Sequence, residues 1–142
     1  MKEEEGLAIK VVNTMFANDW FSQWLGIQLM EVLPGSCTLH MKVKSEMLNG
    51  FSIAHGGITY SLADSALAFA SNSHGRKCIS VETSISHTVS LKEGDRITAK
   101  ATEVYLGNKT AIYEVKISNQ DNLLVAVFKG TVYRTSKLWF GD

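Results

Sequence analysis

Hydrophobic and polar positions alternate with two different periods along this chain, and the periods separate helices from strands. Residues 7–26 have apolar side chains at helical spacing, which predicts an amphipathic N-terminal helix lying on another element. Its apolar positions include Leu7, Val11, Val12, Met15 and Phe16. Residues 27–33 predict a short strand, and Pro34-Gly35 predicts a turn. Residues 36–44 alternate strictly, so we expect a strand that buries Cys37, Leu39, Met41 and Val43.

Four more alternating segments follow, at residues 77–90, 96–106, 110–118 and 123–135. The sequences KEGD, GNK and NQDN between them are typical of hairpin turns, so we expect these strands to pair successively and antiparallel. The order is one helix, two strands, a long helix and four strands. A long apolar helix amid one antiparallel sheet predicts an α+β fold in which the sheet wraps around the helix.

The long helix is predicted from residue 56 to near Gly75, a natural helix-ending residue. Apolar residues cover nearly its whole circumference, which is typical of a helix buried on most sides. It begins with Gly56 and Gly57, after His55. The first amides of a helix have no internal partner and lie at the positive end of its dipole. They can therefore bind an anion or a developing oxyanion, and glycine leaves room for a substrate carbonyl.

Asp64 is the only acidic residue in this helix, and burying a carboxylate without a partner is unfavourable. It lies eight residues after Gly56, which is ~12 Å along a helix axis. One chain therefore cannot use both groups on the same carbonyl. If they serve one reaction, two copies combine, with antiparallel helices that bring Asp64 of one chain to Gly56 of the other.

Length, charge and cysteine content set the remaining expectations. The 142 residues fit a single domain, 1–142, and 14 basic residues balance 14 acidic ones, which gives no support for a nucleic-acid partner. The start MKEEEG is too polar for a signal peptide, and no apolar run reaches membrane-spanning length, so we expect a cytoplasmic protein without membrane contact. Cys37 and Cys78 are expected as free thiols, and no spacing indicates a metal site.

The segment NGFSIAHGGITYSLADSALAFASNS closely resembles the hotdog-fold acyl-CoA thioesterases of the PaaI-like group, named for phenylacetic acid degradation. The matching residues are Asn49, Gly50, His55, Gly56, Gly57, Leu62, Ala63, Asp64 and Ala66. As in that family, the asparagine stands six residues before the histidine and the aspartate nine after it. The strand order is similar to the hotdog fold over roughly residues 25–135.

The resemblance implies roles for four catalytic candidates. The Gly56 amide would hold the thioester oxygen, and Asn49 would orient the substrate or water beside the same carbonyl. Asp64 from the partner chain would act as general base or as nucleophile, and His55 would help to position the thioester. Coenzyme A is part of the substrate, so no cofactor is implied, and the protein would be a dimer or a dimer of dimers with shared sites.

The substrate-binding candidates are Gly57, Ser80, Phe51 and Lys109. Ser80 matches a position that often has a polar side chain near the water or acyl group, and Lys109 matches a basic residue near the nucleotide phosphates. Phe51, with its apolar neighbours, suits an aryl-acetyl or a medium-chain acyl group. Many relatives have Arg-Pro near the end of the strand after the helix, where this chain reads SISHTVS, so coenzyme A contacts are not carried over to that segment.

Other interpretations stay open at this point. His55 could simply cap the helix, Asn49 could stabilise its own turn, Ser80 could be an ordinary strand residue, and Lys109 a solvated lysine. His87 is undecided. The main functional alternative is a non-catalytic acyl-thioester-binding hotdog domain, and a hotdog hydratase or dehydratase fits the pattern less well. Asp64 favours the thioesterase, because binding alone does not need a carboxylate beside the carbonyl.

Overall fold

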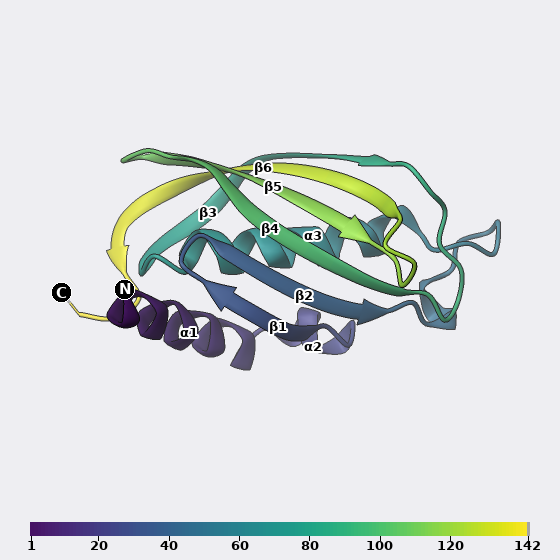
Figure 1. Cartoon of the computed structure of the whole chain (residues 1–142), viewed down its shortest axis with the longest axis horizontal. Coiled ribbons are helices and arrows are strands. Elements are labelled where there is room, and N and C mark those ends of the chain that lie inside the picture. The colour runs from purple at the N-terminus through teal and green to yellow at the C-terminus, as the bar shows by residue number, and fades with distance from the viewer. Residues whose placement is uncertain (142) are drawn as a thin grey trace.

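The computed structural model describes residues 1–141, and its helices and strands follow the predicted order (Figure 1). Their bounds are α1 Lys2–Ala17, α2 Trp20–Trp24, β1 Gln28–Leu33, β2 Ser36–Lys42, a 3-10 turn Ser45–Met47, α3 Gly56–Asn72, β3 Arg76–His87, β4 Arg96–Leu106, β5 Thr110–Ser118 and β6 Leu124–Leu138. The bounds of α3, β4 and β5 lie close to those predicted, because local turn and capping residues delimit these elements.

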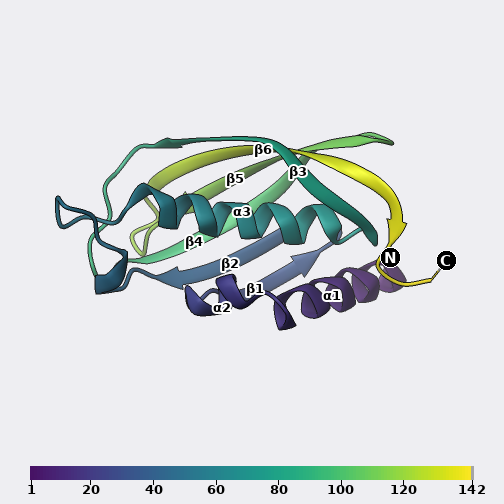
Figure 2. The ribbon, with the colours of Figure 1, turned by 180° about the vertical axis from the view of Figure 1, so that it is seen from behind.

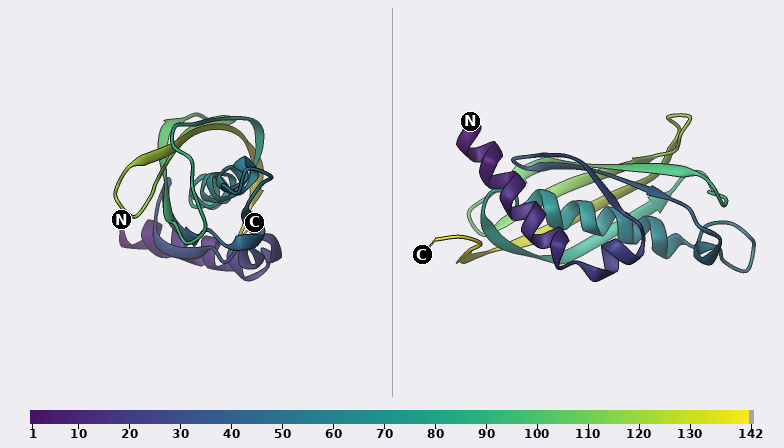
Figure 3. Two further views of the ribbon diagram at one scale, coloured as in Figure 1. Left: turned by 90° about the vertical axis from the view of Figure 1, so that its right-hand side faces the viewer. Right: turned by 90° about the horizontal axis from the view of Figure 1, so that it is seen from below.

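The six strands form one antiparallel sheet in the order β1-β2-β4-β5-β6-β3. The sheet curls around α3, which Figure 3 shows nearly end on in its left-hand view. This confirms the predicted α+β arrangement of a sheet wrapped around a long central helix. No helix among residues 1–141 has the length and hydropathy of a membrane span.

One predicted hairpin, at residues 92–95, is wrong. β3 pairs with β6, with Ile85 opposite Phe128, whereas β4 lies between β2 and β5. The chain after β3 stays on β6, because the Thr88 N–H donates to the Val125 carbonyl at 3.0 Å. The turn that follows is instead tied to the other side of the sheet, where the Val43 N–H donates to the Asp95 carbonyl at 2.8 Å. A turn sequence predicts a reversal, but it does not say which strands pair across it.

The N-terminal helix also differs from the prediction. It begins at Lys2 rather than Leu7, with three acidic residues in its first turn that suit the positive end of the helix dipole. It ends at Ala17, and α2 begins separately because the Asp19 side chain caps it by accepting the Ser22 N–H at 3.0 Å. The buried residues of α1 are Ala8, Val11 and Val12.

The core lies between α3 and the concave face of the sheet. The predicted alternation in β2 is confirmed, since Cys37, Leu39, Met41 and Val43 are all buried. The largest buried side chains around them include Leu62, Leu67, Phe69, Ile97, Tyr113 and Phe128.

One side of α3 is left uncovered by the chain's own elements. From behind, α3 is seen in front of the sheet, between β3 on one side and β1 with the two N-terminal helices on the other (Figure 2). β3 is an edge strand, and the side chains of Ile79 and Val81 on it are each 62% exposed. An exposed apolar edge strand beside a partly uncovered helix is typical of an interface with another chain.

Candidate functional site

The N-terminal end of α3 opens into a cavity of about 310 Å³. Residues lining it include Asn49, Gly56, Thr59, His87 and Leu91. The Gly56 N–H is the first amide of the helix and makes no hydrogen bond with any group of residues 1–141. An unpaired amide at the positive end of a 17-residue helix is suited to receive a carbonyl oxygen or an oxyanion.

The first turn of α3 is fixed by side-chain hydrogen bonds. The His55 Nδ1 accepts the Gly57 N–H at 2.8 Å, so the histidine caps the helix and the Gly57 amide is engaged by that cap. The Thr59 hydroxyl donates to the Gly56 carbonyl at 2.9 Å. The Gly56 N–H is thus the free donor of a turn whose neighbouring groups are already paired.

The loop before α3 fixes Asn49 in a similar way. The Asn49 Oδ1 accepts the Phe51 N–H at 2.9 Å and the Ile53 N–H at 3.4 Å. The Asn49 Nδ2 has no hydrogen-bond partner among residues 1–141, so its two protons are available to a ligand in the cavity. Phe51, at the tip of this loop, is 85% exposed and does not line the cavity.

Asp64 lies in a different cavity, of about 180 Å³, on the open side of α3. Ser80 and Cys78 of β3 line the same cavity, together with Ala68 and Ser71 of α3. The Asp64 carboxylate is half-buried, and no group of residues 1–141 forms a hydrogen bond or an ion pair with it. Burial raises the pKa of this carboxyl above its usual range, and the negative charge of Asp19 raises it further.

A larger cavity of about 520 Å³ adjoins the Asp64 cavity. The two share Ala68, Cys78 and Ile79, and the larger one extends between α1, α3, β3 and the end of β6. Aromatic and apolar residues that line it include Met15, Tyr133 and Trp139. The sequence did not point to these residues, because they come from separate elements and have no shared spacing.

The structure therefore divides the predicted site residues into groups. Asn49 and Gly56 line one cavity, and Asp64 and Ser80 line another. His55 and Gly57 are hydrogen-bonded to each other beside the first cavity. Eight residues of α3 separate Gly56 from Asp64, or ~12 Å along the axis.

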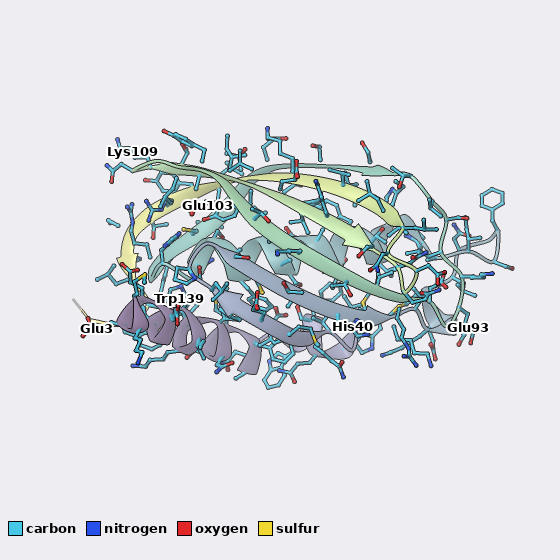
Figure 4. The ribbon with its side chains drawn as sticks, viewed as in Figure 1. Glu3, His40, Glu93, Glu103, Lys109 and Trp139 are labelled. Atoms are coloured by element: carbon cyan, nitrogen blue, oxygen red, sulfur yellow. The ribbon has the colours of Figure 1, made fainter. Side chains whose placement is uncertain are left out.

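Lys109 is not brought to the Gly56 cavity. It lies in the turn between β4 and β5, and Figure 4 shows it at the opposite end of the molecule from Glu93. Glu93 belongs to the turn that follows Leu91, which lines the Gly56 cavity. Lys109 therefore cannot contact a ligand's nucleotide at the Gly56 end of its own chain.

We identify no candidate metal site within residues 1–141. No group of three histidine, cysteine, aspartate or glutamate side chains in this part of the chain is arranged to hold a metal ion. Among the four predicted catalytic residues, the groups without a partner in residues 1–141 are the Gly56 amide, the Asn49 Nδ2 and the Asp64 carboxylate.

Known proteins resemble this chain in sequence and in structure. The model of the family described as "Thioesterase superfamily" matches residues 51–126. The acyl-coenzyme A thioesterase PaaI of Escherichia coli is 35% identical over 122 residues, which are 86% of this chain and 87% of the relative.

Two solved structures extend this similarity. The structure of the E. coli PaaI protein, from the phenylacetic acid degradation operon, superimposes with a TM-score of 0.92 at 33% identity and covers 94% of this chain and 97% of that one. A Streptococcus mutans protein solved with bound acetyl-CoA gives a TM-score of 0.77 at 27% identity, over 79% of this chain and 90% of that one.

Proposed function

This chain belongs to the PaaI-like group of the hotdog thioesterase superfamily, and we propose that it hydrolyses aryl-acetyl- or medium-chain acyl-CoA at sites shared by two copies of itself. Acyl-CoA thioester hydrolysis is the activity of this family. The proposal adds the acyl group, the residues and the assembly. As such an enzyme it would act on cytoplasmic acyl-CoA, without nucleic acid or membrane.

The separation of Gly56 from Asp64 is the observation that carries the proposal. Both lie on α3, ~12 Å apart, and each lines its own cavity. A two-fold axis that sets two α3 helices side by side and antiparallel places Gly56 beside the partner's Asp64, and it does so twice. The uncovered side of α3 and the exposed Ile79 and Val81 on the β3 edge support docking on this face.

The chemistry follows from these groups. The thioester oxygen accepts the Gly56 N–H and an Asn49 Nδ2 proton, which stabilise the negative charge that develops on that oxygen. As general base, the partner's Asp64 takes a proton from water, whose oxygen adds to the carbonyl carbon. The tetrahedral intermediate then collapses, the C–S bond breaks, and the coenzyme A thiolate takes the proton that the partner's Asp64 removed from water, which regenerates the carboxylate. As nucleophile, the carboxylate instead forms a mixed anhydride, which water hydrolyses. Ser80 lines the same cavity as Asp64, which supports a hydrogen bond from its hydroxyl to this water or to the acyl group.

Label found in Asp64 after single-turnover hydrolysis in ¹⁸O-labelled water would identify this residue as the nucleophile. A nucleophilic carboxylate acquires label when its anhydride is hydrolysed at the aspartyl carbonyl, and a general base does not. Mass spectrometry of the peptide that contains Asp64 reads the difference directly.

The larger cavity beside Asp64 supports an aryl or medium-chain acyl group. It is lined by Tyr133, Trp139 and Met15, and it is roomy enough for a ring or a short chain. In the antiparallel pair, the loop that precedes Gly56 continues along the C-terminal half of the partner's α3. Phe51 would then meet the acyl group across the dimer, which suits its 85% exposure in one chain.

Complementation in mixed dimers tests the shared site. We expect Asp64→Ala and Asn49→Ala homodimers to be nearly inactive. A heterodimer of the two, isolated through two different tags, has one site with both residues intact and should regain about half of the wild-type activity. Mixed-tag Asp64→Ala dimers are the control and should regain nothing. No recovery in verified heterodimers would refute the sharing, while a binding domain would show no turnover in any form.

A panel of acyl-CoA thioesters, followed by detection of the free thiol, tests the acyl preference. We expect a higher kcat/KM for phenylacetyl- or hexanoyl-CoA than for acetyl-CoA. A higher value for acetyl-CoA would reject the aryl or medium-chain preference and leave thioester hydrolysis intact. Because Lys109 cannot reach the Gly56 end of its own chain, it would contact coenzyme A bound at the Gly56 end of the partner, so Lys109→Gln should raise KM.

A further inference from the structure

His87, the last residue of β3, contacts the first turn of α3. Its Nε2 lies 2.6 Å from the Thr59 Oγ1. Its ring also lies against Gly56, where a Cβ atom would come within 3.2 Å of the His87 Cε1. The Thr59 hydroxyl has one proton, which it donates to the Gly56 carbonyl at 2.9 Å. The His87 Nε2 must therefore be the protonated nitrogen that donates to Thr59.

This contact completes a clamp on the peptide group between Gly56 and Gly57. The carbonyl of that peptide accepts the Thr59 hydroxyl, and its N–H donates to the His55 Nδ1 at 2.8 Å. The Gly56 N–H itself belongs to the preceding peptide group, whose His55 carbonyl accepts the Ile58 N–H at 3.0 Å. Because glycine has no side chain to restrict the angles between these two peptide groups, the direction of the Gly56 N–H within the turn depends on both of them being held. His87 holds Thr59, and Thr59 holds the peptide.

The contacts that hold the end of β3 in the fold do not involve the imidazole of His87. His87 is exposed, and the end of β3 is already held on β6 by the pairing of His87 with Ala126 and by the backbone and side-chain hydrogen bonds of Thr88. The ring nevertheless lines the cavity that contains Gly56 and Asn49. Its polar contact with the protein goes to Thr59, in the turn that presents the free amide.

We propose that His87 is a positioning residue that aims the Gly56 amide at the substrate carbonyl, acting through Thr59. This inference rests on the proposed thioesterase site, because it gives His87 a role only if Gly56 stabilises an oxyanion. A positioning residue should affect turnover more than substrate binding, since the oxyanion forms only in the transition state.

Substitutions of His87 test the inference. Complete loss of an oxyanion donor lowers rates by ~10²–10³-fold, and a misaimed donor loses part of this, so we expect His87→Leu to lower kcat by roughly tenfold. KM for the best acyl-CoA should change by less than about threefold. His87→Gln places an N–H donor near the position of Nε2 and should restore kcat to within about threefold of wild type.

Thr59 provides an independent arm of the test. Thr59→Val keeps the shape of the buried side chain and removes the hydroxyl, so it should lower kcat as His87→Leu does. Because the two residues act in series, the double variant should be no slower than the slower single variant. His40→Leu is the matched control: His40 of β2 pairs with Thr98 of β4 at 3.4 Å and lines neither cavity, so kcat should not change.

Binding of two inert analogues gives a readout that a purely structural role would not move. One is the phenylacetyl difluoroketone in which CF₂ replaces the thioester sulfur, a ketone whose tetrahedral hydrate resembles the intermediate, and the other is the matching thioether without a carbonyl. We expect His87→Leu to bind the ketone several-fold more weakly and the thioether as tightly as the wild type does. Equal weakening of both analogues would overturn the positioning role, as would a wild-type kcat or a kcat that His87→Gln fails to restore.

The variant Asp64→Asn distinguishes failure of the His87 inference from failure of the proposed thioesterase site. If Asp64→Asn keeps full activity, the proposed site is wrong and the His87 inference is overturned with it. If Asp64→Asn is inactive and His87→Leu turns over at the wild-type rate, the site stands and only the role of His87 is rejected.

Discussion

Two stretches of α3, eight residues apart, treat their polar groups in opposite ways. In the first turn, the Gly57 amide, the Gly56 carbonyl and the Thr59 hydroxyl are all hydrogen-bonded, which leaves one amide free in a fixed direction. Near the middle of the helix, the Asp64 carboxylate has no partner in the chain, and its pKa is raised by burial and by Asp19. Polar contacts therefore order the first turn of α3, whereas the Asp64 carboxylate near the middle of the helix has none.

The difference matches what two catalytic tasks require. A donor that stabilises an oxyanion works best when it is already aimed and does not have to reorganise. A carboxylate that takes a proton or attacks a carbonyl needs basicity, which hydrogen bonds and cations would reduce by lowering its pKa. The same helix can meet both requirements because its N-terminal end presents a free amide, whereas its middle presents only side chains.

Asp64→Asn should give the largest effect, because it removes the unpaired carboxylate near the middle of α3. The substitution keeps the shape and removes the base or nucleophile, so we expect kcat to fall by at least ~10²-fold. Substrate Kd should change little, because coenzyme A and acyl contacts remain. Asp121→Asn, in an exposed turn, is the matched control. A folded Asp64→Asn dimer that retains more than about a tenth of the wild-type kcat would remove Asp64 from catalysis.

The same variant has a thermodynamic signature. Because the folded-state pKa of Asp64 is raised, the folded state holds this proton more tightly than the unfolded state does. The stability that results is present below the unfolded-state pKa, ~3.9, and is lost as pH rises through the folded value. Thermal melts at pH 7 should therefore find Asp64→Asn at least as stable as the wild type, with less loss of stability as pH rises. A clearly lower Tm would indicate a structural role for the carboxylate.

Gly56→Ala tests the hydrogen-bonded first turn of α3 and should have the next largest effect. The new methyl group would meet the His87 Cε1 at 3.2 Å, so the ring or the turn must give by a few tenths of an ångström, and the methyl also crowds an incoming carbonyl. We expect kcat/KM to fall by roughly tenfold, a partial loss of an oxyanion donor. Gly6→Ala in α1, where nothing lies within 4 Å, should leave it unchanged. Equal rates for both variants would contradict the placement of the substrate at Gly56.

Features set by local sequence were predictable. The start of α3 at Gly56, the alternation of β2 and the turns before β5 and β6 depend on neighbouring residues, and the structure has them where the pattern indicates. The pairing of β3 with β6 depends on contacts far along the chain, so the turn at residues 92–95 misled the prediction. The split of the N-terminal helix depends on one capping residue, Asp19, within an otherwise continuous amphipathic pattern.

The site was predictable only in part, for the same reason. The His-Gly-Gly start and the distance to Asp64 are visible in the sequence, and together they predict a site shared by two copies. His87 contacts Thr59 from 28 residues away, and Asp19 influences Asp64 from a different helix, so neither has a local signal. The sequence also led us to group Phe51 with the acyl pocket, whereas in one chain Phe51 is exposed at a loop tip.

Asp19→Asn should give the smallest effect, and it tests why Asp64 is basic. Asparagine caps helices as well as aspartate does, so α2 should keep its start and the fold its stability. Removal of the negative charge takes away the weaker of the two causes that raise the Asp64 pKa, while burial remains. The acid limb of the kcat/KM profile, which reports the base in the free enzyme, should therefore move to lower pH with the plateau unchanged.

The direction of that shift decides the interpretation. An acid limb that moves to higher pH, or that stays in place when Asp19 is neutralised, would mean that Asp19 does not influence the group that limits activity. Asp121→Asn should leave the limb in place, and Asp19→Glu, which keeps the charge, should restore it toward the wild-type position. If the limb persists unchanged in the residual activity of Asp64→Asn, the titrating base is another group. Asp64 would then lie unpaired beside Ser80 for a reason other than proton transfer.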